Sequence, residues 1–134
     1  MKDFAYYAAL PDSMTVEELE EEFVGVLGGF DSKSISGAAV IRPLLELSDR
    51  QWHAYSLLNI SLKTRVEKCL VSMWNGQNRD LVRDIISVMA LLGLDEVFKF
   101  LSMRSKENVS PEVLEEILSA LSELGGIFQI RTVA

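Results

Sequence analysis

Cysteine and histidine are the scarcest chemical groups in this chain of 134 residues, which has one of each, Cys69 and His53. A lone cysteine cannot form an internal disulfide, which is typical of a protein from a reducing compartment. A zinc site needs about four ligands, mostly Cys and His, and the chain has neither a paired-cysteine motif nor HExxH. We therefore expect no metal site and no cofactor, and we interpret Cys69 as a thiol of the core.

Candidates for catalysis are equally few. His53 is the single histidine, the side chain most often used as a general base, and it follows Trp52 on a short helix. An aromatic neighbour favours a packing or rim position for this imidazole. We expect no catalytic residue, and a protein that is not an enzyme.

Long apolar runs are also missing. A membrane-spanning helix needs about 20 apolar residues, but the longest run here, residues 85–94, is interrupted by Ser87 and Gly93. Residues 1–13 have an acid at position 3 and no long apolar stretch, unlike a secretory signal. We expect a cytoplasmic protein that does not bind a membrane, folded as one helical domain over residues 1–134.

Basic residues are outnumbered, with 13 Lys and Arg against 20 Asp and Glu and a net charge of -7. Residues 1–47 hold nine acids and three bases, and residues 107–134 hold five acids and one base. Nucleic-acid binding needs a concentrated basic surface, so we exclude it as the main activity. Acidic ends suit a basic protein partner, although acids that only keep a small domain soluble explain them equally well.

One helical pattern is present twice, in residues 78–93 and again, at an offset of 32, in residues 110–125. A repeat of about 30 residues that contains a helix pair is the signature of an α-solenoid, whose units bury their apolar faces against neighbours. The matching is position by position: Leu81, Val82, Ile85, Ile86, Met89, Leu92 and Gly93 correspond to Val113, Leu114, Ile117, Leu118, Leu121, Leu124 and Gly125.

Cap residues and apolar spacing place the other helices. Thr15 and Glu18 form a capping box that starts a helix over residues 16–27. Further helices are expected over residues 38–47, 48–59, 62–74, 78–92, 95–104 and 111–124, with Ser48 and Gln51, Ser61, Asn78 and Ser110 as caps.

The glycine pairs Gly28–Gly29 and Gly125–Gly126 follow helices, so we interpret them as helix ends and not as phosphate-binding loops. Short irregular arms are expected over residues 1–10 and 127–134. The sequence therefore predicts an all-α fold of six to seven helices, arranged as a HEAT-like stack of antiparallel pairs. Residues 62–92 and 95–124 form the two clearest pairs, and a less regular pair precedes them.

Two acidic strips and two tryptophans are the candidate partner-binding residues. Exposed charges steer association, and tryptophan is prominent among interface hot spots. A solvated face and ordinary core packing are the alternatives for these residues. The candidates are Glu17, Glu20, Glu21 and Glu22 near the N-terminus, Glu112, Glu115, Glu116 and, with less support, Glu123 near the C-terminus, and Trp52 and Trp74.

Residues 52–101 contain WHAYSLLN, NRDLVRDIISVMALLG and GLDEVFKFL, and this stretch resembles the small all-α immunity proteins of bacterial polymorphic-toxin and contact-dependent growth inhibition systems. The resemblance implies a cytoplasmic protein that binds the toxin domain of a cognate effector, commonly a nuclease, and occludes its active site. It implies no particular contact residue. The alternative is a HEAT-like adaptor or scaffold that binds a cellular protein or peptide.

Overall fold

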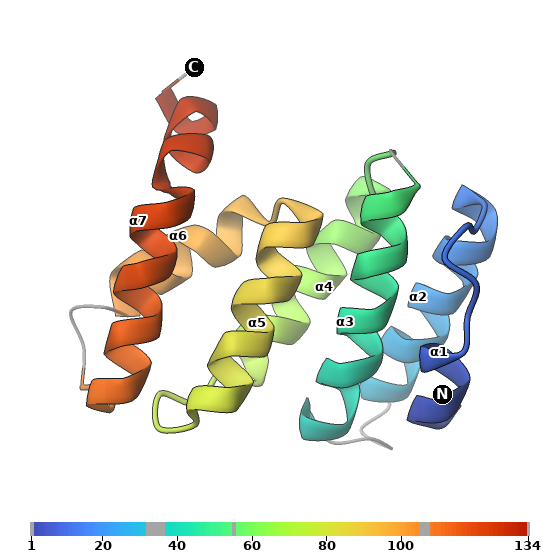
Figure 1. The fold of residues 1–134 in the computed structure, drawn as a ribbon, viewed down its shortest axis with the longest axis horizontal. Coiled ribbons are helices and arrows are strands. Elements are labelled where there is room, and N and C mark those ends of the chain that lie inside the picture. Colours follow the sequence, from blue (N-terminus) through green and yellow to red (C-terminus); the bar gives the residue numbers. More distant parts are fainter. Residues whose placement is uncertain (1, 32–36, 55, 105–107, 134) are drawn as a thin grey trace.

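The computed structural model describes residues 2–31, 37–54, 56–104 and 108–133 (Figure 1). Every secondary-structure element in these residues is a helix, which confirms the all-α prediction. Within the same ranges, no helix is both long enough and apolar enough to cross a membrane. The helices are α1 (Phe4–Ala8), α2 (Val16–Asp31), α3 (Gly37–His53), α4 (Ile60–Ser72), α5 (Arg79–Leu92), α6 (Asp95–Arg104) and α7 (Pro111–Val133).

The helices form two layers, with α3, α5 and α7 side by side in one layer and α2, α4 and α6 behind them (Figure 1). Contacts run along each layer, from α3 to α5 to α7 and from α2 to α4 to α6. Each helix of the rear layer is followed in the chain by its antiparallel partner in the front layer. The predicted stack of three helix pairs is thus confirmed, and α1 lies against α3 as a short N-terminal turn.

Three predicted helix starts are confirmed by their hydrogen bonds. The Thr15 N–H donates to Oε1 of Glu18 at 2.9 Å, and the Glu18 N–H donates to Oγ1 of Thr15 at 3.1 Å. Asn78 and Ser110 each accept from a backbone N–H three residues further on, at 3.1 and 3.2 Å. These side chains satisfy donors that the first helical turn leaves without a partner.

The predicted break between residues 47 and 48 is wrong, because α3 is one continuous helix from Gly37 to His53 that passes through Pro43. Ser48 is fully buried, and its hydroxyl donates to the carbonyl of Leu44 at 2.7 Å, so it closes onto the preceding turn instead of capping a new one. The cap of α4 also differs from the prediction. Asn59 caps this helix in place of the predicted Ser61. Its Oδ1 accepts a hydrogen bond from the N–H of Ser61 at 2.8 Å.

Two predicted glycine ends are also wrong, since α2 continues through Gly28 and Gly29, and α7 continues through residues 125–126. The expected irregular C-terminal arm is therefore helical to Val133, and it extends beyond the neighbouring helices (Figure 1). A glycine inside a helix costs only about 1 kcal/mol relative to alanine. A cost of this size does not end a helix by itself. The helix ends at a glycine where other contacts stabilise the turn that follows.

At Gly93, other contacts do stabilise the end of the helix. This residue ends α5 in the left-handed region at φ 68° and ψ 46°. The N–H of Leu94 donates to the carbonyl of Met89 at 3.0 Å, and the Leu94 side chain is fully buried. Both features belong to the helix end in which a left-handed glycine is followed by an apolar contact.

Gly93→Ala is expected to lower the free energy of unfolding by about 1 kcal/mol, because a Cβ is strained at positive φ. Gly25→Ala is the matched control. Gly25 lies inside α2, where an added Cβ would meet nothing within 4 Å, so this change should stabilise by about 0.5–1 kcal/mol. Urea unfolding of both variants measures the difference, and equal effects of the two substitutions would contradict the assignment.

One continuous core runs between the two layers and collects side chains from all seven helices. Cys69 is buried in it, which confirms the interpretation of this residue as a core thiol. Tyr7 brings α1 into the same core. The largest fully buried side chains are Tyr7, Phe23, Leu19, Leu27, Leu44, Leu47, Leu70, Ile85, Met89, Leu94, Leu101 and Ile117.

A polar network joins α4 to α6. The buried carboxylate of Glu67 accepts a hydrogen bond from the N–H of Glu96 at 3.0 Å, in the first turn of α6. Beside it, Nζ of Lys63 donates to Oδ1 of Asp95 at 2.8 Å. Burial raises the pKa of Glu67, whereas the Lys63 hydrogen bond lowers the pKa of Asp95. As the pH falls, the contribution of Glu67 to the free energy of unfolding therefore rises and that of Asp95 falls.

Glu67→Gln is expected to raise the free energy of unfolding near neutral pH and to change it little below pH 4.5, the ordinary pKa of this group. Because the folded-state pKa is raised, the contribution of Glu67 is complete below its ordinary pKa and is lost as the pH rises through the raised value. Glutamine keeps an acceptor for the Glu96 N–H and does not ionise.

Urea unfolding from acid to neutral pH measures this profile. Asp95→Asn is the control of opposite sign: it should destabilise near neutral pH, and the loss should shrink as the pH falls below 3.8, the ordinary pKa of this group. A difference between Glu67→Gln and the natural protein that does not vary with pH would contradict the burial of this charge.

Candidate partner-binding site

Three large apolar side chains are exposed where α3 passes into α4. Trp52 is 60 % exposed, Leu57 89 % and Ile60 79 %. We call these three residues the α3–α4 corner. Exposed apolar residues scattered singly are ordinary, but three large ones within nine residues of the chain favour an interaction site. The connection lies at one edge of the helical stack, between the end of α3 and the start of α4 (Figure 1).

Hydrogen bonds hold the α3–α4 connection from both sides. Nε2 of the buried Gln51 donates to the carbonyl of Ser56 at 2.7 Å. Asn59 caps α4 through its side chain, and Leu58 packs against the core. With Leu58 directed inward, Leu57 on one side of it is left in solvent. Residues 56–59 are already held by these contacts, so ordering them costs less conformational entropy when a partner binds.

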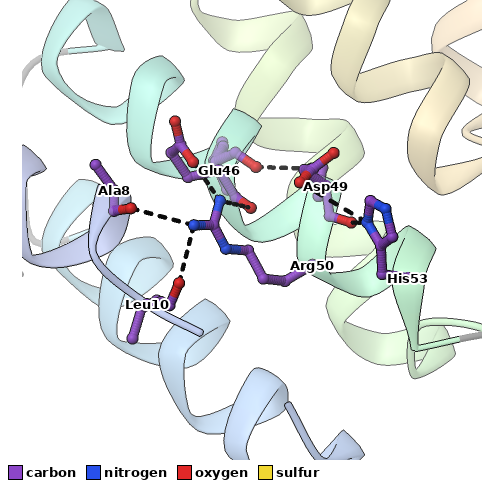
Figure 2. A network of polar contacts seen from close by, with 8 residues as sticks. Ala8, Leu10, Glu46, Asp49, Arg50 and His53 are labelled. Atoms are coloured by element: carbon purple, nitrogen blue, oxygen red, sulfur yellow. Dashed lines mark hydrogen bonds and ion pairs between the residues drawn. The ribbon is translucent and has the colours of Figure 1, made fainter. Parts of the chain in front are cut away.

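The last turns of α3 are held in place by a buried arginine (Figure 2). Nη2 of Arg50 donates to the carbonyls of Ala8 at 3.2 Å and Leu10 at 3.0 Å, and Nη1 forms an ion pair with Glu46. Arg50 is 6 % exposed. The guanidinium thus ties the end of α1 to the helix that carries Trp52.

His53 lies one turn beyond this arginine and is exposed. Its Nδ1 lies 2.8 Å from the carbonyl oxygen of Asp49 and 3.8 Å from Oδ2 of the same residue (Figure 2). The ring is therefore turned back onto its own helix. His53 is therefore exposed near the end of α3, and of the two roles expected from the sequence the exposure favours a rim position over packing.

The predicted acidic strip on α2 does not form one face. Glu17 and Glu21 are exposed, whereas Glu20 and Glu22 are half-buried. Oε2 of Glu22 is buried without a hydrogen-bond partner among the described residues, and its charge contributes to the raised pKa values of Lys2 and Tyr7. Of these four acids, only Glu17 and Glu21 are exposed.

The second predicted strip lies on α7, at the other end of the stack from α2 (Figure 1). Glu112 and Glu115 are exposed. Glu116 is already engaged, because its Oε1 accepts from Nε of Arg79 at 3.1 Å and lies 3.7 Å from Nε of Arg83. The two acidic strips are therefore separate surfaces, and Glu116 belongs to the contact between α5 and α7.

Trp74 differs from Trp52 in its surroundings. Its ring is half-buried and meets the ring of Phe100 edge to face, with centroids 5.5 Å apart. It also packs against the core. The structure thus favours packing for Trp74 and an accessible position for Trp52, and the partner-binding role of both remains a prediction.

Sequence reasoning missed Leu57 and Ile60. Leu57 falls in the helix predicted over residues 48–59, and Ile60 falls between that helix and the one predicted from residue 62. The signal was an apolar segment next to Asn59, a residue typical of helix starts. Apolar residues placed at a helix connection have no layer to cover them.

No protein-family model, curated protein or solved structure matches this chain.

Proposed function

We propose that this protein is an immunity protein that binds a basic toxin domain and neutralises it by covering its active site. The observation that carries the proposal is the α3–α4 corner, where Trp52 near the end of α3, Leu57, and Ile60 at the start of α4 are exposed. Tryptophan is among the residues most enriched in interface hot spots, which makes Trp52 the expected anchor of this surface. The resemblance of residues 52–101 to immunity proteins supplies the class of partner.

Charge supports the same partner. Because α2 and α3 are antiparallel neighbours, the first turn of α2 lies at the same edge of the stack as the end of α3 (Figure 1). The exposed Glu17 is therefore on the side that a partner of the corner approaches. With a net charge of -7, the protein attracts a basic domain before contact, which raises the association rate.

Neutralisation by this route needs no catalytic group in the protein. It needs an interface of about 1,600 Å² in total with a few buried anchors. The helical stack supplies a rigid surface, and the corner supplies the anchors. The toxin loses activity because its substrate can no longer reach the covered site.

Affinity capture tests the proposal. Tagged full-length protein is used to capture partners from the cells that naturally make it, followed by mass spectrometry and titration. A single stoichiometric partner with nanomolar affinity, toxic when made alone, is the expected result. Several weak partners that are harmless when made alone would overturn it and favour a HEAT-like adaptor.

A further inference from the structure

The outer side of α7 carries an apolar row that the other described helices cover only in part, since Leu121 packs against the core at its inner edge. Leu118 is 52 % exposed, and Leu114 and Leu121, one turn to either side, are half-buried. We call these three leucines the α7 end face. They lie on the last helix of the stack, where Leu114 and Leu121 border the buried Ile117 and Leu118 lies further out.

The internal repeat shows what such a face accommodates. At the offset of 32, Leu114, Leu118 and Leu121 correspond to Val82, Ile86 and Met89 of α5. Val82 and Met89 are fully buried, and Ile86 packs against the core. The next helix of the front layer, α7, lies beside α5. The α7 end face therefore has the form of a helix-binding surface without its helix, because solenoid units bury their faces against the next unit.

The charges beside this row differ between the two helices. On α5, Arg83 approaches Glu116 of α7 across the contact between units, together with Arg79. On α7, the residue that corresponds to Arg83 is Glu115, which is exposed. The sign of the charge is thus inverted. A helix seated on α7 as α7 is seated on α5 needs a basic side chain where α7 has Glu116.

We propose that the α7 end face binds a helix of a partner protein whose apolar row covers Leu118 and whose Lys or Arg lies opposite Glu115. A second copy does not fit as the next unit, because its own Glu116 would face Glu115 and like charges repel. The site lies at the end of the stack away from α1 and α2 (Figure 1). It deepens the proposed function by naming a feature of a basic partner, and it is tested separately from the corner.

Two stapled helical peptides of residues 111–125 provide the probe, one with the natural sequence and one with Glu116→Lys. Their affinities for the full-length protein are measured by fluorescence anisotropy. The lysine peptide is expected to bind about fivefold more tightly, the upper range for one exposed charge pair. Glu115→Lys in the protein should invert this preference. The new lysine repels the lysine of the variant peptide and attracts Glu116 of the natural peptide.

Leu118→Glu should weaken binding of the lysine peptide by at least about tenfold, because it removes a leucine from the buried row. Leu57→Asp, an exposed change at the α3–α4 corner, is the matched control and should leave peptide binding unchanged. Absence of binding, or binding indifferent to Leu118 and Glu115, would overturn the proposal. So would a dimer in sedimentation equilibrium that Leu118→Glu dissociates. Neither result would alter capture of a toxin through the corner.

Discussion

Arg50→Ala is expected to lower the free energy of unfolding by about 3 kcal/mol, because this one buried side chain donates hydrogen bonds to four acceptors. Arg50 is 6 % exposed and donates to the carbonyls of Ala8 and Leu10 as well as to Glu46. Without it, the two carbonyls lose their donor and the Glu46 carboxylate loses its counter-charge. The end of α1 then loses the two hydrogen bonds that Arg50 of α3 donates to it.

Urea unfolding measures the loss, and amide hydrogen exchange localises it. Faster exchange is expected at Tyr6 and Ala9, whose N–H groups form the hydrogen bonds of α1. Arg42→Ala is the matched control, since Arg42 is exposed and lies over the ring of Phe4 at 5.6 Å, a contact worth about 0.5–1 kcal/mol. Equal destabilisation by the two substitutions would show that the buried network of Arg50 has no special weight.

Trp52→Ala is expected to weaken binding of the captured partner by at least about 2 kcal/mol, or about 30-fold, with little change in stability. The indole is 60 % exposed in the free protein, so its truncation leaves no cavity in the core. In the complex it becomes a buried anchor beside Leu57 and Ile60. The effect should appear mainly as faster dissociation.

Isothermal titration with the purified partner measures this affinity. Met103→Ala is the control, because Met103 on α6 is 61 % exposed and lies away from the corner in the chain. It matches Trp52 in exposure and is expected to leave affinity unchanged. Equal affinities of the natural protein and the Trp52→Ala variant would remove the corner from the interface.

Helix starts could be predicted where a side chain caps its own helix, as at Thr15, Asn78 and Ser110, because the hydrogen bond is local in sequence. Helix ends could not be predicted from glycine alone. Gly93 ends α5 because Leu94 enters the core, whereas Gly28 leaves α2 intact. The difference depends on packing between helices that are distant in the chain.

The candidate site was predictable only in part for the same reason. Trp52 stood out by its residue type, but the exposure of Leu57 follows from Gln51 and Leu58, which fix the connection from inside. The pairing of Glu116 with Arg79 requires α5 and α7 to lie side by side. The internal repeat predicted that these two helices are neighbours. It did not indicate which acidic residues would form ion pairs between them.

Growth rescue tests the central claim most directly. The captured partner is expressed in a susceptible host alone, with the natural protein, and with the Trp52→Ala, Leu57→Asp double variant. The partner alone should stop growth, the natural protein should restore it, and the double variant, folded to the same extent, should fail to do so. Growth that continues with the partner alone, or full rescue by the double variant, would contradict neutralisation through the α3–α4 corner.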